Sequence, residues 1–219
     1  MLAHSPTAVL FDLDGTLIDS IELILSSYRH TMLEHRGATP PDTVWVAGLG
    51  TPLWTQFRKF TDDESEVAAM VETYRGHNLA NHDRMVRPYP GVLEAVRTLH
   101  EAGRDLAIVT SKTRDGAHRG LRHCGFDGLF PVVVGADDVE RHKPDPAPVR
   151  HALELLGVAP GDAVFVGDSP HDLVAGRAAG VRTAAVAWGP FPREELHALR
   201  PDIWIQTAED LAQFGRDAP

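Results

Sequence analysis

Four short polar segments of this sequence contain residue types that could bind or transfer an anionic group. The first is Asp12-Leu13-Asp14-Gly15-Thr16, and the last is Gly167-Asp168-Ser169-Pro170-His171-Asp172; both are rich in carboxylates. Between them lie Thr110-Ser111-Lys112 and His142-Lys143-Pro144-Asp145-Pro146, which supply hydroxyl and ammonium groups. Carboxylates gathered in a cleft repel one another unless a cation lies among them, while hydroxyl and ammonium groups can donate to phosphate oxygens. Together, the four segments predict a bound divalent metal ion, close to hydroxyl and ammonium groups that suit an anion.

Each segment also has an ordinary structural interpretation when it is considered alone. Asp14-Gly15 can form a simple bend. Thr110 or Ser111 can cap a helix, and Asp172 can begin one. A single loop lysine is usually solvated. The functional interpretation therefore depends on whether the fold brings the four segments together.

The elements that would position these segments alternate between short apolar runs and helical stretches. Buried strands are predicted at residues 8–11, 106–109, 132–134, 163–166 and 183–187, with a weaker candidate at 203–205. Helices are predicted at residues 92–101, 115–124, 148–156 and 172–179. This alternation is typical of right-handed βαβ crossovers and predicts an α/β fold with a mostly parallel, Rossmann-like sheet. Because ligands bind outside the carboxyl ends of such strands, the four segments are expected to meet at one edge.

Residues 19–87 interrupt this alternation. They contain no convincing strand, but apolar residues recur at helical spacing over 21–36, 52–60 and 64–81. Since ordinary crossovers are much shorter, we expect an inserted helical cap at residues 19–87, with the α/β core built from residues 1–18 and 88–219. The cap is expected to determine substrate specificity.

Two features of the cap could contact a ligand. The loop Gly48-Leu49-Gly50-Thr51-Pro52-Leu53 carries two glycines, which would allow close approach of the backbone to an anion; an ordinary turn between helices is an equally good interpretation. Arg58 and Lys59 are candidates for recognising a second anionic group, although such residues more often form a solvated helix face.

Composition limits the classes of function. The 219 residues carry a formal net charge of −10, which argues against nucleic-acid binding, because that binding relies on Lys and Arg. No stretch approaches the roughly 20 apolar residues needed to cross a bilayer. The first residues show no basic segment followed by an apolar one, so we predict a cytoplasmic protein without a secretory signal. The single cysteine, Cys124, cannot form an internal disulfide.

The motifs resemble those of a known superfamily. Asp12-Leu13-Asp14-Gly15-Thr16, Thr110, Lys143 and residues 167–172, in this order and at these intervals, are similar to the four motifs of the haloacid dehalogenase superfamily. The resemblance covers nearly the whole chain and includes the position and size of the cap. The segments around Thr110 and Lys143 more closely resemble phosphoglycolate phosphatases and PpaX-type pyrophosphatases. The implied fold is a Rossmann-like parallel sheet with an inserted helical cap.

The resemblance implies a role for each acidic residue. Asp12 would be the nucleophile that forms an aspartyl-phosphate, and Asp14 would be the general acid and base. Asp12, Asp14 through its backbone carbonyl, and Asp168 would bind Mg²⁺. Asp172 would hold metal-bound water or orient Lys143.

The resemblance also implies which residues bind the phosphoryl group. Thr110, Ser111 and Lys143 would bind its oxygens, and Lys143 would also be catalytic. Gly15 and Thr16 would complete the substrate-binding set. These roles agree with phosphoryl transfer, which needs alignment and charge neutralisation more than covalent chemistry.

Asp14 narrows the expected reaction, because its carboxylate suits cleavage of a P–O bond in which the leaving oxygen needs a proton. We therefore expect a Mg²⁺-dependent phosphatase, monomeric or homodimeric, that acts on a small phosphomonoester resembling phosphoglycolate or on pyrophosphate. A phosphosugar mutase of the same superfamily shares this aspartate and is one alternative. A phospho-aspartate signalling module is another, although such modules are much shorter, lack a helical insertion and carry the acceptor on a later strand.

Overall fold

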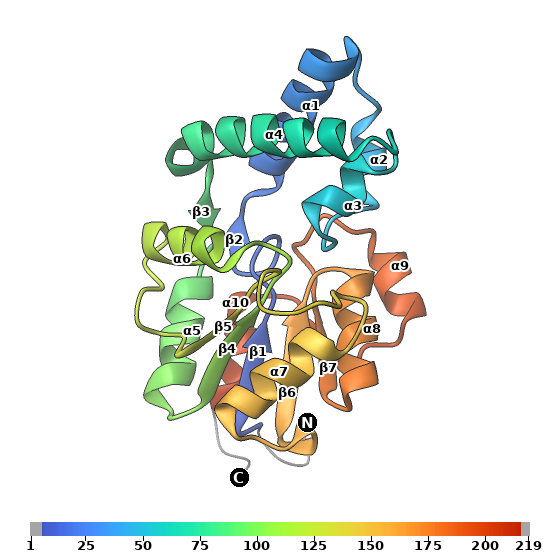
Figure 1. Cartoon of the computed structure of the whole chain (residues 1–219). Helices are drawn as coiled ribbons and strands as arrows, with labels where there is room; N and C mark the ends of the chain where they lie inside the picture. Colours follow the sequence, from blue (N-terminus) through green and yellow to red (C-terminus); the bar gives the residue numbers. More distant parts are fainter. Residues whose placement is uncertain (1–5, 216–219) are drawn as a thin grey trace.

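The computed structural model describes residues 6–215. Within them, six strands form one sheet in the order β5-β4-β1-β6-β7-β8, and every neighbouring pair runs parallel (Figure 1). The strands are β1 (Ala8–Phe11), β4 (Asp105–Val109), β5 (Val132–Val134), β6 (Ala163–Gly167), β7 (Arg182–Val186) and β8 (Ile203–Ile205). The predicted α/β fold is therefore confirmed. The prediction of no secretory signal concerns the first residues of the chain, and residues 1–5 lie outside those described.

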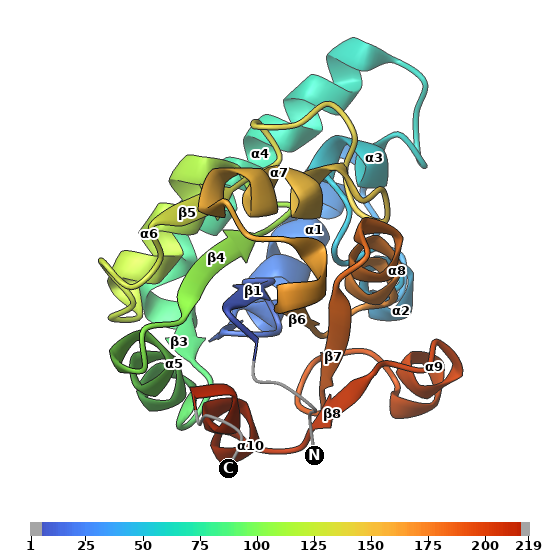
Figure 2. The ribbon, with the colours of Figure 1, turned by 90° about the horizontal axis from the view of Figure 1, so that it is seen from below.

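Helices cover both faces of the sheet (Figure 2). Val9 and Phe11 of β1 belong to the apolar cluster on one face, whereas Ala8 and Leu10 belong to the cluster on the other. The helices of the first face are α5 (Val92–Glu101), α6 (Arg114–His123) and α10 (Ala208–Ala212), and those of the second are α7 (Ala147–Leu156) and α8 (Pro170–Ala179). Short elements complete this part of the chain: α9 (Arg193–Ala198), η1 (Pro160–Asp162) and η2 (Gln213–Gly215). Because successive side chains of a strand point to opposite faces, a strand covered on both faces is apolar throughout.

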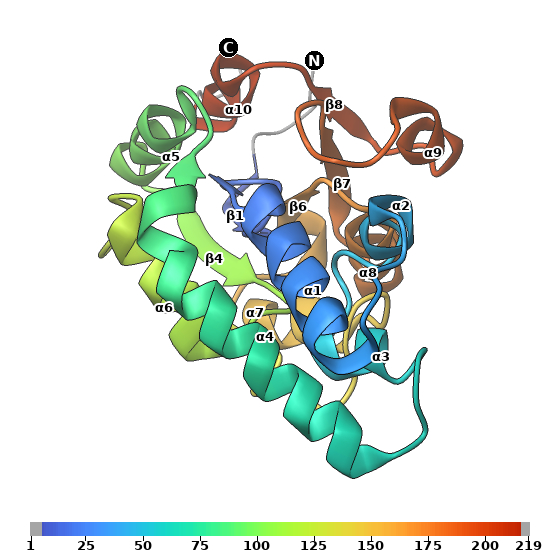
Figure 3. The ribbon, with the colours of Figure 1, turned by 90° about the horizontal axis from the view of Figure 1, so that it is seen from above.

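A group of helices from residues 19–87, for which we keep the name cap, lies beyond the carboxyl ends of the strands (Figures 1 and 3). They are α1 (Ile21–Arg36), α2 (Asp42–Val46), α3 (Leu53–Phe57) and α4 (Glu64–Met85). The chain enters and leaves this group through β2 (Ile18–Asp19) and β3 (Arg87–Pro88), which pair antiparallel. The two connections are thus hydrogen-bonded to each other.

An aromatic cluster links the four helices of the cap. Trp45 is fully buried and stacks on Tyr28, with ring centroids 4.2 Å apart and an interplanar angle of 7°. Phe57 and Tyr74 pack against the same tyrosine at steeper angles. Each helix contributes one of these rings, so the cluster fixes all four relative to one another.

The differences from the predicted elements lie mainly in the cap. Helix α2 and the pair β2–β3 were not predicted, because five helical residues and two-residue strands are too short to show a periodic pattern. Helix α4 extends one turn beyond residue 81, over His82-Asp83-Arg84, where polar residues obscure the apolar repeat. Helix α3 is shorter than the predicted stretch 52–60.

Replacement of Trp45 with alanine should destabilise the protein strongly, because a fully buried indole would leave a cavity beside Tyr28. Changes of this kind lower the free energy of unfolding by about 3–5 kcal/mol. Urea denaturation followed by circular dichroism measures the loss. Leu33→Ala is the control, since Leu33 is 54% exposed on α1. A loss no larger than that of the control would contradict the packing described above.

Candidate active site

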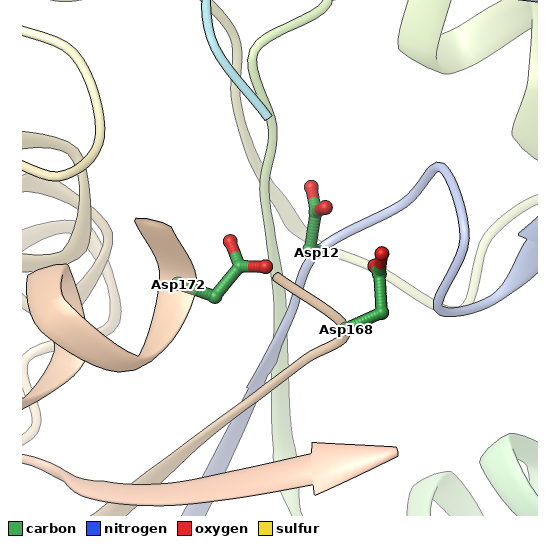
Figure 4. A group of neighbouring side chains, drawn as sticks. All are labelled: Asp12, Asp168 and Asp172. Carbon is green, nitrogen blue, oxygen red and sulfur yellow. The ribbon is translucent and has the colours of Figure 1, made fainter. Parts of the chain in front are cut away.

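Three carboxylates meet at the carboxyl ends of β1 and β6. Phe11 and Val166 are paired in these neighbouring strands, so Asp12 and Asp168 leave the sheet side by side. Asp172 lies in the first turn of α8. All three side chains are buried, and one carboxylate oxygen of each lies within 4.8 Å of the others (Figure 4). The structure thus brings together the first and last of the four polar segments.

Lys143 lies behind this cluster and is only 2% exposed. Its Nζ is 2.9 Å from Oδ1 of Asp12 and 2.7 Å from Oδ1 of Asp172. It also donates to the backbone carbonyl of Val109, at 3.2 Å. An ammonium group has three hydrogens to donate, so these contacts occupy all of them. The ammonium therefore holds the Asp12 carboxylate in place. In this arrangement it has no hydrogen left to donate to a bound phosphoryl group.

Asp172 connects the lysine to the start of α8. Its Oδ2 accepts hydrogen bonds from the backbone N–H of Ser169 at 3.0 Å and from the Ser169 hydroxyl at 2.6 Å. This capping box fixes the first turn of α8 while Oδ1 remains on Lys143. Asp172 therefore serves the ordinary capping role and also orients the lysine.

Asp168 is held by residues that pack closely around it. The Thr16 hydroxyl donates to Oδ1 of Asp168 at 2.6 Å, and the indole N–H of Trp188 donates to the Thr16 carbonyl at 3.0 Å. A Cβ at Gly15, where φ is +87°, would lie 2.6 Å from Oδ2 of Asp168. A Cβ at Gly189 would lie 2.3 Å from the Asp168 Cβ. The absence of a side chain at Gly15 and Gly189 thus allows Asp168 to pack closely against both. No motif marks Gly189, so the sequence alone does not single it out.

The electrostatics of the cluster favour a bound cation. Burial, opposed by Lys143 and reinforced by Asp172, raises the pKa of Asp12 to about 7. Burial, together with repulsion from Asp12 and Asp172, raises the pKa of Asp168 well above its usual range. Burial opposes the charge on Lys143, but attraction to Asp12 and Asp172 outweighs it and raises the pKa of the ammonium. One ammonium group thus faces three carboxylates, and buried carboxylate oxygens are ligands that fit Mg²⁺.

Asp14 has a separate environment at the edge of the cluster. Its Oδ1 accepts hydrogen bonds from the Lys112 ammonium and from the Ser20 hydroxyl. The sequence segment Thr110-Ser111-Lys112 contains this lysine, but spacing along the chain gave no reason to pair it with Asp14. The structure therefore adds Lys112 to the candidate functional residues.

A cleft of about 700 Å³ opens between the core and the cap. The predicted site residues that line it are Asp12, Asp14, Thr110, Ser111 and Asp168. The predicted site residues that are buried and do not line it are Gly15, Thr16, Lys143 and Asp172. The core contributes most of the charged and polar lining, whereas the cap contributes most of the apolar lining.

The cap reaches the core through the predicted glycine loop. The Ser111 hydroxyl donates to the carbonyl of Gly50 at 2.6 Å. A Cβ at Gly50, where φ is +85°, would lie 3.1 Å from the Ser169 hydroxyl oxygen. Arg58 and Lys59 do not line the cleft: Arg58 forms a bidentate contact with Glu64, and Lys59 donates to Gln56.

Comparisons of sequence place this geometry in a family. Residues 9–186 match a family model described as haloacid dehalogenase-like hydrolase. The chain is 43% identical over 203 residues to pyrophosphatase PpaX of Halalkalibacterium halodurans, covering 93% of this chain and 94% of that protein. It is also 43% identical over 207 residues to pyrophosphatase PpaX of Bacillus velezensis, covering 94% of each.

Solved structures share the same architecture. A proposed phosphoglycolate phosphatase of Lactobacillus plantarum has a TM-score of 0.85 at 27% identity and covers 96% of this chain and 99% of its own. A haloacid dehalogenase-like family hydrolase of Streptococcus pneumoniae, 24% identical, has the same fold, with a TM-score of 0.83 over 97% of this chain and 99% of its own. The resemblance noted in the motifs is thereby confirmed: the chain belongs to the haloacid dehalogenase-like hydrolase family.

Proposed function

We propose that this protein is a Mg²⁺-dependent phosphatase that cleaves a small phosphomonoester or pyrophosphate through an aspartyl-phosphate intermediate. The observation that carries the proposal is a buried aspartate, Asp12, held by Lys143 beside other carboxylates and facing the cleft. The names of the relatives, pyrophosphatase and phosphoglycolate phosphatase, support the same class of reaction. The hydrolase family itself supports the expectation of an enzyme.

Asp12, Asp168 and the backbone carbonyl of Asp14 would hold the metal ion. When bound, Mg²⁺ neutralises negative charge on the substrate and on the carboxylates. Thr16 would act indirectly, because its hydroxyl is already donated to Asp168. Gly15 would likewise serve by admitting Asp168 to its position. We therefore assign Thr16 and Gly15 to positioning of Asp168, a proposed ligand of the metal ion, rather than to contact with the substrate.

In the first half of the reaction, a carboxylate oxygen of Asp12 forms a bond to phosphorus as the bond to the leaving oxygen breaks. Asp14 donates a proton to that leaving oxygen. In the second half, Asp14 takes a proton from water as the water oxygen bonds to phosphorus and the bond between phosphorus and the Asp12 oxygen breaks. Phosphate is released, and both aspartates return to their starting states. The Lys112 ammonium and the Ser20 hydroxyl, which both contact Oδ1 of Asp14, hold its side chain in position for these transfers.

The two hydroxyl residues at the end of β4 differ in what they can offer a phosphoryl group. The Thr110 oxygen accepts from the backbone N–H of Lys112 at 3.2 Å, which leaves the hydroxyl hydrogen free to donate into the cleft. The Ser111 hydroxyl instead donates to Gly50 of the cap. Thr110 is therefore the direct phosphoryl ligand, and Ser111 would become one only if the cap loop moved.

The cap, residues 19–87, is proposed to be the specificity domain of a two-part enzyme whose core comprises residues 1–18 and 88–219. Contact between Gly50 and Ser111 supports this role, since it brings the cap loop to the phosphoryl site. A helical insertion and an acceptor at the end of the first strand also distinguish this chain from a phospho-aspartate signalling module.

Among residues 6–215, no helix combines the length and apolar character needed to cross a membrane. Cytoplasmic location, absence of nucleic-acid binding and a monomeric or homodimeric state stay predictions.

Removal of the metal or of the nucleophile should abolish phosphate release. With p-nitrophenyl phosphate, EDTA is expected to stop turnover and Mg²⁺ to restore it. Asp12→Asn should lower kcat roughly a thousandfold or more, because no other group can take its place. Asp115→Asn is the control, since Asp115 lines the same cleft outside the carboxylate cluster. Retained turnover in Asp12→Asn would refute the assigned nucleophile.

Asp14→Asn should lose turnover but keep metal binding, because only the proton transfer is removed. The expected loss is about 10²–10⁴-fold. It should be larger for ethyl phosphate than for p-nitrophenyl phosphate, since p-nitrophenolate leaves without a proton. Initial rates for both esters and calorimetric titration with Mg²⁺ measure these effects. Equal losses for the two esters would argue against acid catalysis by Asp14.

Lys143→Met should lower the free energy of unfolding in EDTA by about 3–5 kcal/mol, because it leaves the buried carboxylates of Asp12 and Asp172 without their counter-ion. Lys112→Met is the matched control: its contact with Asp14 lies nearer solvent, and a loss of about 1 kcal/mol is expected. Urea denaturation measures both. Similar losses for the two variants would contradict the role of Lys143 as the buried counter-ion.

A further inference from the structure

The cap presents exposed apolar side chains to the cleft. Trp54 is 40% exposed and Leu79 is 56% exposed, and both line the same cleft as Asp12. Trp54 lies in the first turn of α3, and Leu79 lies on α4. Neither Trp54 nor Leu79 belongs to the aromatic cluster around Tyr28 and Trp45 that holds the cap helices together. Packing of the cap therefore does not explain these two residues.

One face of the Trp54 indole is covered by a cation, while the residue as a whole is 40% exposed. The guanidinium of Arg75, one turn before Leu79 on α4, lies over this ring at 5.5 Å from its centroid. A planar ligand group can stack on an indole in the same way, and Leu79 lines the same cleft. Exposed apolar surface of this kind at a cleft typically marks the place where a ligand buries its own apolar surface.

We infer that the substrate is an organic phosphomonoester that carries a flat, apolar group, and that this group binds against Trp54 and Leu79 while the phosphate lies at Asp12. The inference rests on the proposed phosphatase function and specifies its substrate class. Pyrophosphate has no apolar surface and gains nothing from these side chains. The cleft joins both regions, with most of the charged lining on the core and most of the apolar lining on the cap.

A matched pair of esters tests this inference. Benzyl phosphate and ethyl phosphate both release a primary alcohol, so they differ mainly in apolar area near the phosphate. The wild-type protein with Mg²⁺ should show a kcat/KM for benzyl phosphate about tenfold or more above that for ethyl phosphate, mainly through a lower KM. Trp54→Ala should bring this ratio close to one, Trp54→Phe should retain most of it, and Leu79→Ala should lower it less. The ratio does not depend on how much of a variant is folded.

Leu33→Ala is the control, because Leu33 is an exposed apolar residue of the cap that does not line the cleft, and its ratio should equal that of wild type. A wild-type ratio near one, or a ratio that Trp54→Ala leaves unchanged, would overturn the inference while the phosphatase function stands. Hydrolysis of pyrophosphate with neither ester cleaved would also overturn it. Failure to release phosphate from pyrophosphate and from both esters would instead remove the proposed function, and the inference with it.

Discussion

The contact of buried Lys143 with Asp12 and Asp172 is the interaction on which the proposed site depends. It joins the end of β1 to the first turn of α8, and it anchors a lysine that comes from the connection after β5. Charges of opposite sign attract strongly where water is excluded, so this arrangement fixes the direction of the Asp12 carboxylate. The single charge of Lys143 does not neutralise all three carboxylates, because Asp168 also lies in the cluster and its pKa is raised. The same geometry therefore orients the proposed nucleophile, Asp12, and leaves the cluster with negative charge that a bound cation would neutralise.

In the proposed function, the core carries out the chemistry and the cap selects the substrate. Parallel strands place the polar residues at one edge of the core, where the ends of β1, β4 and β6 lie next to one another. The cap covers this edge with a largely apolar wall and touches it through Gly50 and Ser111. Changes in the cap wall could thus alter which organic group is accepted without disturbing Asp12 or Lys143.

Much of this architecture follows from the sequence, because the signals concerned are local. Each sheet strand is a continuous apolar run, since both faces of the sheet are covered. Likewise, the helical insertion is visible as a long stretch without a strand. Long-range contacts leave no such signal: the pairing of Lys112 with Asp14, the close packing of Gly189 on Asp168 and the complete use of the Lys143 donors all depend on folding. A local signal can also mislead. The charges of Arg58 and Lys59 made them candidates for binding an anionic group, but neither residue lines the cleft.

Identification of the phosphorylated residue is the most direct test of Asp12 as the nucleophile. The protein would be mixed with Mg²⁺ and a rapidly cleaved phosphate ester, quenched in acid within one turnover and digested, and the peptides would be sequenced by mass spectrometry. An acid-stable phosphoryl group is expected on Asp12, where it appears and decays within the time of turnover. A phosphoryl group on a different side chain, or hydrolysis with no labelled peptide at any time, would contradict it.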